Sequence, residues 1–280
     1  MVAAVQSRSR QEAMALVMVL WIVAALSIAV TGIVWLARSE IRQASAMQDS
    51  AQGVATGRAA MVEVLQQLLA MKSVRIDRPE RRVVHFEDVE FEVLVLPLNG
   101  WVDLNRAPLA LLAALLEHGA HLNSEAARRL AGDIVARRSM ALPQGTPALF
   151  DAVEDLMQLP GIDYEAYARL APLVTVDSGG NGQVNAYAAP PAVLLALTHG
   201  NQAAANGFFA VREHGPGDLS GFDTALVTSG GSSALRIIAR PVLASASPYT
   251  VVCDVVLLGQ STKAAPWNFL QCSYGTTATW

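Results

Sequence analysis

The sequence predicts an α+β fold that combines a long N-terminal helix, an antiparallel sheet and a large all-α insertion. An uninterrupted helical pattern at the N-terminus is the first observation behind this prediction. Runs of alternating apolar residues at 83–96 and 234–258 are the second, because a period of two is typical of half-buried strands. The third is the region 101–200 between them, which is rich in Ala and Leu. Strands on both sides of a helical block indicate one domain with a helical insertion.

The stretch 14–37, MALVMVLWIVAALSIAVTGIVWLA, contains no charged residue. As a helix it would extend about 36 Å, against about 30 Å for the hydrocarbon core of a bilayer. Arginines lie on both sides of it, so the positive-inside rule alone fixes no orientation. Three interpretations compete: a cleaved secretory signal, a plain membrane anchor, and a prepilin-type leader with its hydrophobic helix. The length of the stretch and the lack of a small-x-small cleavage site disfavour the first.

The helical pattern continues from Ser39 to Lys72, a segment without proline. Asp77-Arg78-Pro79 then ends it, which predicts one helix that is uniformly apolar at first and amphipathic later. The apolar stripe of the second half comprises Val54, Met61, Val64, Leu65, Leu68 and Leu69.

The strand predictions follow from alternation and turn residues. Val83–Phe86 is expected to pair as a hairpin with the segment 89–96, turning near Glu87-Asp88. Two further strands are expected at 234–240 and 249–258, joined by a turn at 245–248, and the tail from there to Trp280 is expected to be irregular.

The insertion is expected to consist of short helices. Asn105 is the predicted N-cap of a first helix that has Pro108 in its first turn and ends at Gly119. Ser124 is the predicted cap of a second helix, which runs to Arg138. Short helices are expected on either side of Leu159-Pro160-Gly161-Ile162, at 150–158 and 164–170.

The insertion also contains an internal repeat. The segment Gly100–Pro108 matches Gly182–Pro190 at a constant offset of 82 residues. Both segments continue into an apolar helix that ends in His-Gly. The repeat indicates a reused folding unit rather than a catalytic one.

Composition narrows the classes of function. The net charge of −4 and the scattered arginines argue against a nucleic-acid surface, which needs a concentrated basic patch. The two cysteines, Cys253 and Cys272, permit one disulfide or two free thiols, and no CxxC or His/Cys cluster indicates zinc.

No constellation of a nucleophile, a base and an orienting group is present, so no catalytic residue is assigned and a membrane-anchored periplasmic hydrolase has no support. The loop 177–185 carries oxygen ligands and glycines that could wrap calcium, but it lacks the full spacing and the last glutamate of an EF-hand. A solvated turn is the favoured interpretation of this loop.

The segment Leu159–Ile162 with the helix after it resembles a helix-hairpin-helix, a DNA-binding unit that contacts phosphate through backbone amides. The acidic residues Asp163 and Glu165 follow it, and they would repel phosphate. A membrane-tethered helix-hairpin-helix DNA-binding protein is therefore the alternative rather than the leading hypothesis.

Taken in order, these features resemble the minor pseudopilin K family of type II secretion systems. The resemblance spans nearly the whole chain. The matching motifs are Arg8–Ala13 with the apolar run from Met14, Val102–Pro108 and its second copy at Val184-Asn185, Leu159–Ile162, and a late strand Ser-x-x-x-Arg-Ile at 232–237.

The resemblance implies a pilin-like fold whose helix packs on the sheet, with a prepilin-type leader at 1–13, a transmembrane part at 14–37, the amphipathic helix and first strands at 38–100, the insertion at 101–200 and the remaining strands at 201–280. Prepilin peptidase would cut between Ala13 and Met14 and Met14 would be N-methylated, although prepilin leaders usually have glycine at this place. The fifth mature residue would be Met18. Most pilin-like subunits carry glutamate there to neutralise the terminal amine of the subunit above, and the absence of glutamate marks a subunit at the tip.

The implied function is structural. The protein would cap a periplasmic pseudopilus with the minor pseudopilins I and J, contact other pseudopilins, and support export of folded proteins across the outer membrane. The resemblance places it in the inner membrane as a single-pass protein with its globular part in the periplasm, without a nucleic-acid partner. Family members bind calcium in the globular part, and the resemblance assigns no calcium ligands in this sequence.

Overall fold

The computed structural model describes residues 3–71, 75–86, 88–141, 145–212, 215, 217–243, 249–258 and 266–276. Within α1 and at the end of the last strand, some side chains lie outside this description, namely those of 3–17, 28–29, 31–34, 36–37, 39, 41 and 276. The chain divides into two compact units, Met1–Gly53 and Val54–Trp280.

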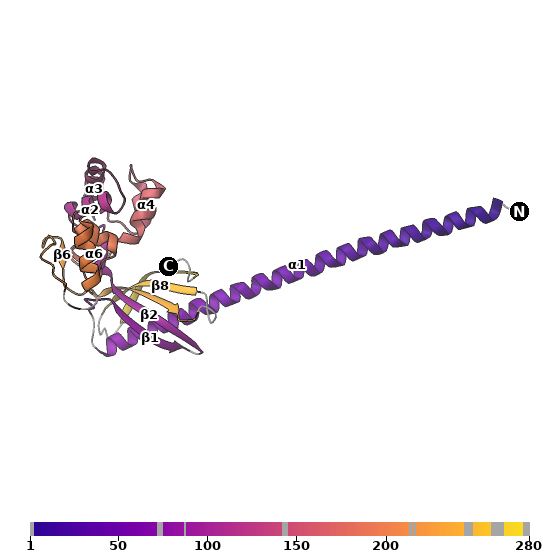
Figure 1. The fold of residues 1–280 in the computed structure, drawn as a ribbon, viewed down its shortest axis with the longest axis horizontal. Coiled ribbons are helices and arrows are strands. Elements are labelled where there is room, and N and C mark those ends of the chain that lie inside the picture. The colour runs from indigo at the N-terminus through magenta and orange to yellow at the C-terminus, as the bar shows by residue number, and fades with distance from the viewer. Residues whose placement is uncertain are drawn as a thin grey trace. The chain divides into compact units, whose positions relative to one another are not determined.

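The N-terminal helix α1 runs without interruption from Ala3 to Ala70 (Figure 1). Up to Gly53 it belongs to the first unit, and from Val54 it belongs to the second. The prediction of one long helix is confirmed, because no proline interrupts the sequence before Pro79. Lys72, its predicted end, lies outside the described residues. In the second unit the helix buries the centre of the predicted stripe, namely Met61, Val64, Leu65 and Leu68.

The second unit contains a five-stranded antiparallel sheet of order β1-β2-β7-β8-β9. The predicted hairpin is confirmed by the pairing of the first two strands, in which Phe86 lies opposite Val89. The strands are β1 (Glu80–Phe86), β2 (Val89–Pro97), β7 (Ala234–Pro241), β8 (Tyr249–Leu257) and β9 (Trp267–Thr276).

The expectation of an irregular tail is wrong, because Trp267–Thr276 forms the edge strand β9. The segment 270–274 is exposed throughout, so its sequence, LQCSY, lacks the alternation by which a half-buried strand is recognised. The strand forms because pairing with β8 supplies its backbone hydrogen bonds, and the local sequence gives no sign of this pairing. Residues 277–280 lie outside the described part of the chain, as does the predicted turn at 245–248.

The two faces of the sheet differ. One face packs on α1 and forms an apolar core with it, to which the strands contribute Val84, Phe91, Val93, Val95, Leu235, Ile237, Ala239, Val251, Cys253, Val255 and Leu257. The opposite face carries the intervening residues and includes cross-strand ion pairs: Arg240 bonds Glu92 across β2 and β7, and Arg236 bonds Asp254 across β7 and β8. The sheet therefore uses one face for hydrophobic burial and the other for polar contacts.

The insertion lies between β2 and β7, and its helices group together in Figure 1. The 3₁₀ helix η1 (Leu98–Gly100) leads from the sheet into it. Its longer helices are α2 (Leu109–His118), α3 (Ser124–Ser139), α4 (Tyr164–Leu170), α5 (Pro191–Leu197) and α6 (Gln202–Val211). Two more 3₁₀ helices are η2 (Val153–Gln158) and η3 (Ala171–Leu173).

Both predicted helix caps in the insertion are wrong. Pro108, not Asn105, is the N-cap of α2, and the Asn105 side chain is used elsewhere. Asn123, not Ser124, caps α3, because its side-chain oxygen accepts a hydrogen bond from Ala126 N at 2.8 Å. In α3 two neighbouring polar residues, Asn123 and Ser124, compete for the cap, whereas α2 begins after Pro108 without a side-chain cap, and in both cases the backbone path decides where the helix begins.

The insertion also contains four two-residue strands, which form two parallel pairs: β3 (Val102–Asp103) with β4 (Val174–Thr175), and β5 (Val184–Asn185) with β6 (Val227–Thr228). Its apolar core continues past residue 200, because Ala205, Phe208 and Val227 belong to it. The α+β fold class, with a long helix, an antiparallel sheet and a helical insertion, is confirmed.

The two copies of the repeat pack against each other reciprocally. A Cβ atom on Gly182 would lie 2.1 Å from the carbonyl oxygen of Arg106, and a Cβ on Gly100 would lie 2.6 Å from that of Ala188. Since Gly100 and Gly182 are equivalent, and Arg106 and Ala188 are equivalent, each copy presents its glycine to the same position of the other. This is the contact pattern of a two-fold axis. The repeat is thus a pseudo-symmetric pair whose close approach requires glycine.

Candidate functional site

The predicted processing residues Ala13 and Met14 lie within α1, and their side chains are outside the described residues. Met18 is described, and its side chain is 70% exposed in the first unit. The predicted span 14–37 includes several side chains outside the description. The processing site and the tip marker stay predictions.

Among the residues whose placement is described, no helix has the length and hydropathy that crossing a bilayer requires.

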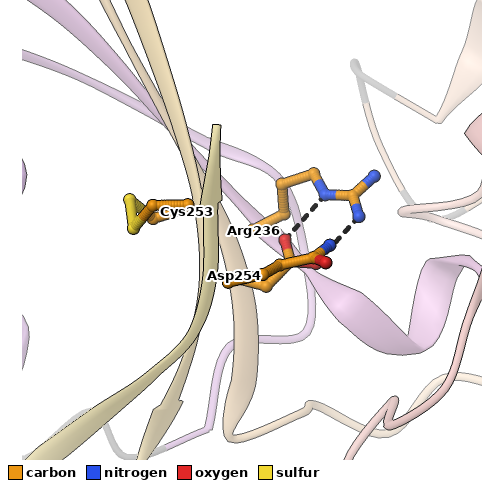
Figure 2. Close-up of a disulfide and its surroundings, with 5 residues drawn as sticks. Arg236, Cys253 and Asp254 are labelled. Atoms are coloured by element: carbon orange, nitrogen blue, oxygen red, sulfur yellow. Dashed lines mark hydrogen bonds and ion pairs between the residues drawn. A yellow bond between two sulfur atoms is a disulfide. The ribbon is translucent and has the colours of Figure 1, made fainter. Parts of the chain in front are cut away.

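Cys253 and Cys272 form a disulfide between β8 and β9. The two residues lie directly opposite each other in the strand register, with their Cα atoms 4.2 Å apart. Cys253 is fully buried in the core of the sheet, whereas Cys272 lies on the exposed edge strand. In Figure 2 the sulfur atoms lie on one side of β8 and Asp254 lies on the other. The disulfide therefore joins the edge strand β9 to β8 on the side of the sheet where α1 packs.

Arg236 and Asp254 connect the sheet to the insertion. The Arg236 guanidinium donates two hydrogen bonds to the Asp254 carboxylate, at 2.8 and 2.9 Å (Figure 2). Gln271 Nε2 donates a third at 2.9 Å. The guanidinium also lies 4.8 Å from the ring centre of Trp101, whose Nε1 donates to Pro172 O. Sequence reasoning missed this cluster, although charged residues such as Arg236 and Asp254 within largely apolar strand patterns are a detectable signal.

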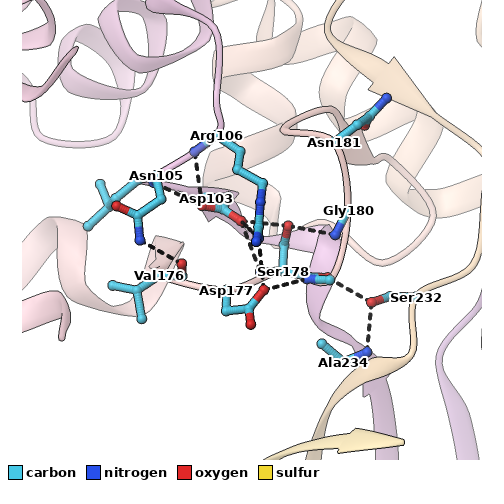
Figure 3. Close-up of polar contacts among 12 residues, drawn as sticks. Asp103, Asn105, Arg106, Val176, Asp177, Ser178, Gly180, Asn181, Ser232 and Ala234 are labelled. Atoms are coloured by element: carbon cyan, nitrogen blue, oxygen red, sulfur yellow. Dashed lines mark hydrogen bonds and ion pairs between the residues drawn. The ribbon is translucent and has the colours of Figure 1, made fainter. Parts of the chain in front are cut away.

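Asp103 is the centre of the polar network in the insertion (Figure 3). Its side chain is 1% exposed and accepts hydrogen bonds from the backbone N–H groups of Asn105, Arg106 and Ser178. The Ser178 hydroxyl and the Arg106 guanidinium donate to it as well, at 2.8 and 3.1 Å. One carboxylate thus joins the turn before α2 to the loop after β4. A buried carboxylate is stable when donors surround it in this way.

Arg106 bridges two carboxylates, since it also donates to Asp177 Oδ1 at 2.8 Å. The hydrogen bond that Arg106 donates to Asp177 raises the pKa of Arg106, against the opposing effect of its partial burial. Asn105, rather than capping α2, donates to the carbonyls of Phe150 and Val176 and accepts from Phe150 N. The short segment before α2 therefore holds the surrounding loops together.

Arg138 at the end of α3 donates to the carbonyl oxygens of Leu104 and Ala107 at 2.8 Å. Burial lowers its pKa, since desolvation disfavours the charged form. These carbonyls lie just before α2, so the arginine fixes the end of α3 to the start of the preceding helix.

The loop 177–185 does not fit a calcium site. Asp177 and Asp103 share the Arg106 guanidinium, so each carboxylate already has a cationic partner within the protein. The cavity beside the loop, of about 330 Å³, is lined by Arg75, Asn99, Asn181, Gln183, Thr228 and glycines, without a carboxylate. A calcium cage takes six to eight oxygens and normally uses carboxylates. Across the described ranges, no three His, Cys, Asp or Glu residues gather where they could hold a metal.

The Leu159–Ile162 segment forms a turn in which Gly161 has φ +96°. Asp163 then caps α4, its carboxylate accepting from Ala166 N at 2.7 Å. The start of this helix is thus occupied by a carboxylate, at the place where a helix-hairpin-helix would offer its amides to phosphate.

Comparison with known proteins gives one informative result. No protein-family model and no curated protein matches the sequence. Among solved structures, a chain of the GspK-GspI-GspJ complex from the enterotoxigenic Escherichia coli type 2 secretion system is similar, with a TM-score of 0.53 and 15% sequence identity. The similarity covers 84% of this chain and 100% of that chain. The fold of this chain is therefore GspK-like, as its ordered motifs predicted.

Proposed function

We propose that this protein is a structural minor pseudopilin at the tip of a type II secretion pseudopilus. The observation that carries the proposal is the similarity over most of the chain to a component of a GspK-GspI-GspJ complex. This chain combines a long helix α1, a five-stranded antiparallel sheet and a helical insertion, and the similarity covers 84% of it. In this role the protein supports secretion without being an enzyme.

The proposed partners are the minor pseudopilins I and J, which accompany GspK in the similar structure. With 68 residues, α1 is long enough to be the helix through which the subunits polymerise. The apolar stretch 14–37 would anchor the chain in the inner membrane, with the globular part in the periplasm. The disulfide between Cys253 and Cys272 is compatible with that compartment, because disulfides persist in oxidising environments.

Met18 supports a position at the tip. Inside a membrane, a carboxylate at the fifth mature position is costly unless a neighbouring amine neutralises it. The first subunit has no subunit above it and thus no amine to neutralise. The insertion adds bulk that would be hard to accommodate along a filament shaft, and a tip subunit avoids this conflict.

The N-terminus of the mature protein tests the proposal. In cells with an active prepilin peptidase, mass spectrometry should find a chain that begins with N-methylated Met14, and cells without the peptidase should keep Met1. Ala13→Gly should increase the processed fraction, because glycine is the usual residue before the cut. An unprocessed chain in both strains would contradict the leader assignment.

Assembly is tested by co-expression with the I and J pseudopilins of the same secretion system. The full chain, extracted in a non-ionic detergent, should purify together with both. Failure to bind either one would contradict the position at the tip. Salt-sensitive binding of duplex DNA by the same preparation would instead support the helix-hairpin-helix alternative.

A further inference from the structure

A groove of about 650 Å³ lies between the sheet and the second copy of the repeat. On the sheet side it is formed by the start of β1 and by Leu94 and Leu96 of β2, which belong to the face opposite α1. On the insertion side it is formed by 187–191 and by Phe209 and Arg212 at the end of α6. We call it the arginine groove. Its volume falls in the range typical of ligand-binding clefts.

Three arginines and one glutamate line the groove, namely Arg78, Arg81, Arg212 and Glu80. Glu80 is paired with Arg82, which is not part of the lining. Arg81 is paired with Glu92, but its side chain is 67% exposed and can turn toward a ligand. In the described part of the chain no carboxylate pairs with Arg78, which donates only a long hydrogen bond of 3.4 Å to Gly215 O. The lining therefore has an excess of positive charge.

Two of the arginines are held on aromatic rings. The Arg78 guanidinium lies 4.4 Å from the ring centre of Tyr187, and that of Arg212 lies 4.3 Å from the ring centre of Phe209. Tyr187 is itself fixed, since its hydroxyl donates to Gly217 O at 3.1 Å. Arg212 is already engaged by the protein, because its Nη1 donates to the carbonyl oxygens of Ala186 and Ala189 at 3.2 and 2.6 Å. For Arg78, stacking restricts the orientation of the guanidinium and leaves N–H groups available at its edge, which favours recognition of carboxylates. The remaining lining is largely apolar, with Leu94, Leu96 and the Pro190-Pro191 pair.

We propose that the arginine groove binds an acidic peptide segment of a partner protein, with carboxylates at Arg78 and Arg81 and an apolar side chain against the prolines and leucines. Charge complementarity identifies the occupant. A nucleic acid would bring many phosphates to a chain whose net charge is −4, whereas a short acidic segment needs to match only the local excess of arginine. The apolar lining favours a peptide further, because peptides carry carboxylates and apolar side chains together. This binding does not depend on assembly of the chain into a pseudopilus.

Fluorescence anisotropy tests the proposal with the full chain in a non-ionic detergent. The probe is the fluorescein-labelled peptide Asp-Phe-Glu-Asp-Phe-Glu, and the matched control is Asn-Phe-Gln-Asn-Phe-Gln. The acidic peptide should bind saturably and more weakly as salt is added, and the amide control should bind at least about ten-fold more weakly. Arg78→Glu should weaken binding of the acidic peptide at least about ten-fold. Arg81→Gln, at an exposed position, should weaken it about two-fold to five-fold.

Arg128→Glu is the control variant, because Arg128 is exposed on α3 and does not line the groove, while the charge change is the same. It should change the affinity by less than about two-fold. Thermal melting checks that each variant is folded. If Arg78→Glu is unfolded, the affinity of the exposed Arg81→Gln variant for the acidic peptide tests the proposal instead. The proposal is overturned by equal binding of the two peptides, by equal effects of Arg78→Glu and Arg128→Glu, or by no saturable binding up to about 1 mM. Binding of phosphatidylglycerol vesicles that depends on Arg78, without peptide binding, would also overturn it.

Discussion

In the first copy of the repeat, the buried side chain of Asp103 accepts five hydrogen bonds, whereas in the second copy the equivalent Asn185 makes two. Both residues follow a valine in a two-residue parallel strand, and both accept from the N–H two residues later. Arg106 in the first copy corresponds to Ala188 in the second. The backbone is shared, and the side chains differ in charge.

Because of this difference in side chains, the two copies are attached to different parts of the protein. Asp103 and Arg106 connect the first copy to the loop at 177–178 within the insertion. Asn185 instead donates from Nδ2 to Asp77 O at 2.6 Å, so the second copy is attached to the chain just before β1. The same copy supplies Tyr187 and the two prolines of the arginine groove. Duplication of one folding unit has thus provided one copy that stabilises the insertion and one that faces the sheet.

The contact between the copies gives the largest expected effect. Gly182→Ala should destabilise the protein by about 3 kcal/mol, because alanine at φ +93° is strained and its Cβ would meet Arg106 O at 2.1 Å. The reciprocal Gly100→Ala, with a contact of 2.6 Å and no positive φ, should cost about 2 kcal/mol. Urea unfolding followed by circular dichroism measures both.

Gly132 provides the control for this pair. It lies in α3 with no atom within 4 Å of an added Cβ, so Gly132→Ala should stabilise the protein by about 1 kcal/mol. If Gly182→Ala proved as harmless as Gly132→Ala, the pseudo-symmetric contact would be refuted.

Removal of the charge in the first copy should have the next largest effect. Asp103→Ala leaves buried donors of Ser178 and Arg106 without their acceptor and should cost about 3 kcal/mol or slightly less, since Arg106 is partly solvated. Asp103→Asn should cost less, because an amide oxygen still accepts but does not pair with Arg106. Hydrogen exchange of the segment 176–180 should increase in both variants. Unchanged exchange there would argue against Asp103 as the organiser of the loop.

The equivalent change in the second copy should have the smallest effect. Asn185→Ala removes one hydrogen bond to Asp77 O and leaves the N–H of Tyr187 without its acceptor, at a cost of about 1–2 kcal/mol. Faster hydrogen exchange should appear near 75–80 rather than near 176–180. A cost equal to that of Asp103→Ala would mean that the two copies do not differ in the way described.

Much of this arrangement was predictable from sequence because it depends on local signals. The helical period up to Ala70, the alternation in β2 and the offset of 82 residues in the repeat are visible without a structure. Each reflects a periodic requirement that burial imposes on neighbouring residues. The order of the motifs also sufficed to predict a GspK-like fold.

Other features depended on residues far apart in the chain. The segment 270–274 of β9 is exposed and gains its structure from pairing with β8, so this part of the sequence carries no strand pattern. Asn105 does not cap α2 as predicted, because its side chain donates hydrogen bonds to the carbonyl oxygens of Phe150 and Val176, which lie in loops distant in the sequence. The groove arises only where β1 and β2 meet the second copy of the repeat.

The sequence by itself therefore determined the long helix, the strands with one buried face, and the duplicated unit, because periodicity and repetition are properties of neighbouring residues. Tertiary structure alone decided which loop Asp103 came to bind, which face of the sheet met the insertion, and where Arg78 came to lie on Tyr187. The physical reason is that hydrogen bonds, ion pairs and aromatic contacts between distant segments depend on how the chain is brought together, and a linear pattern does not record this.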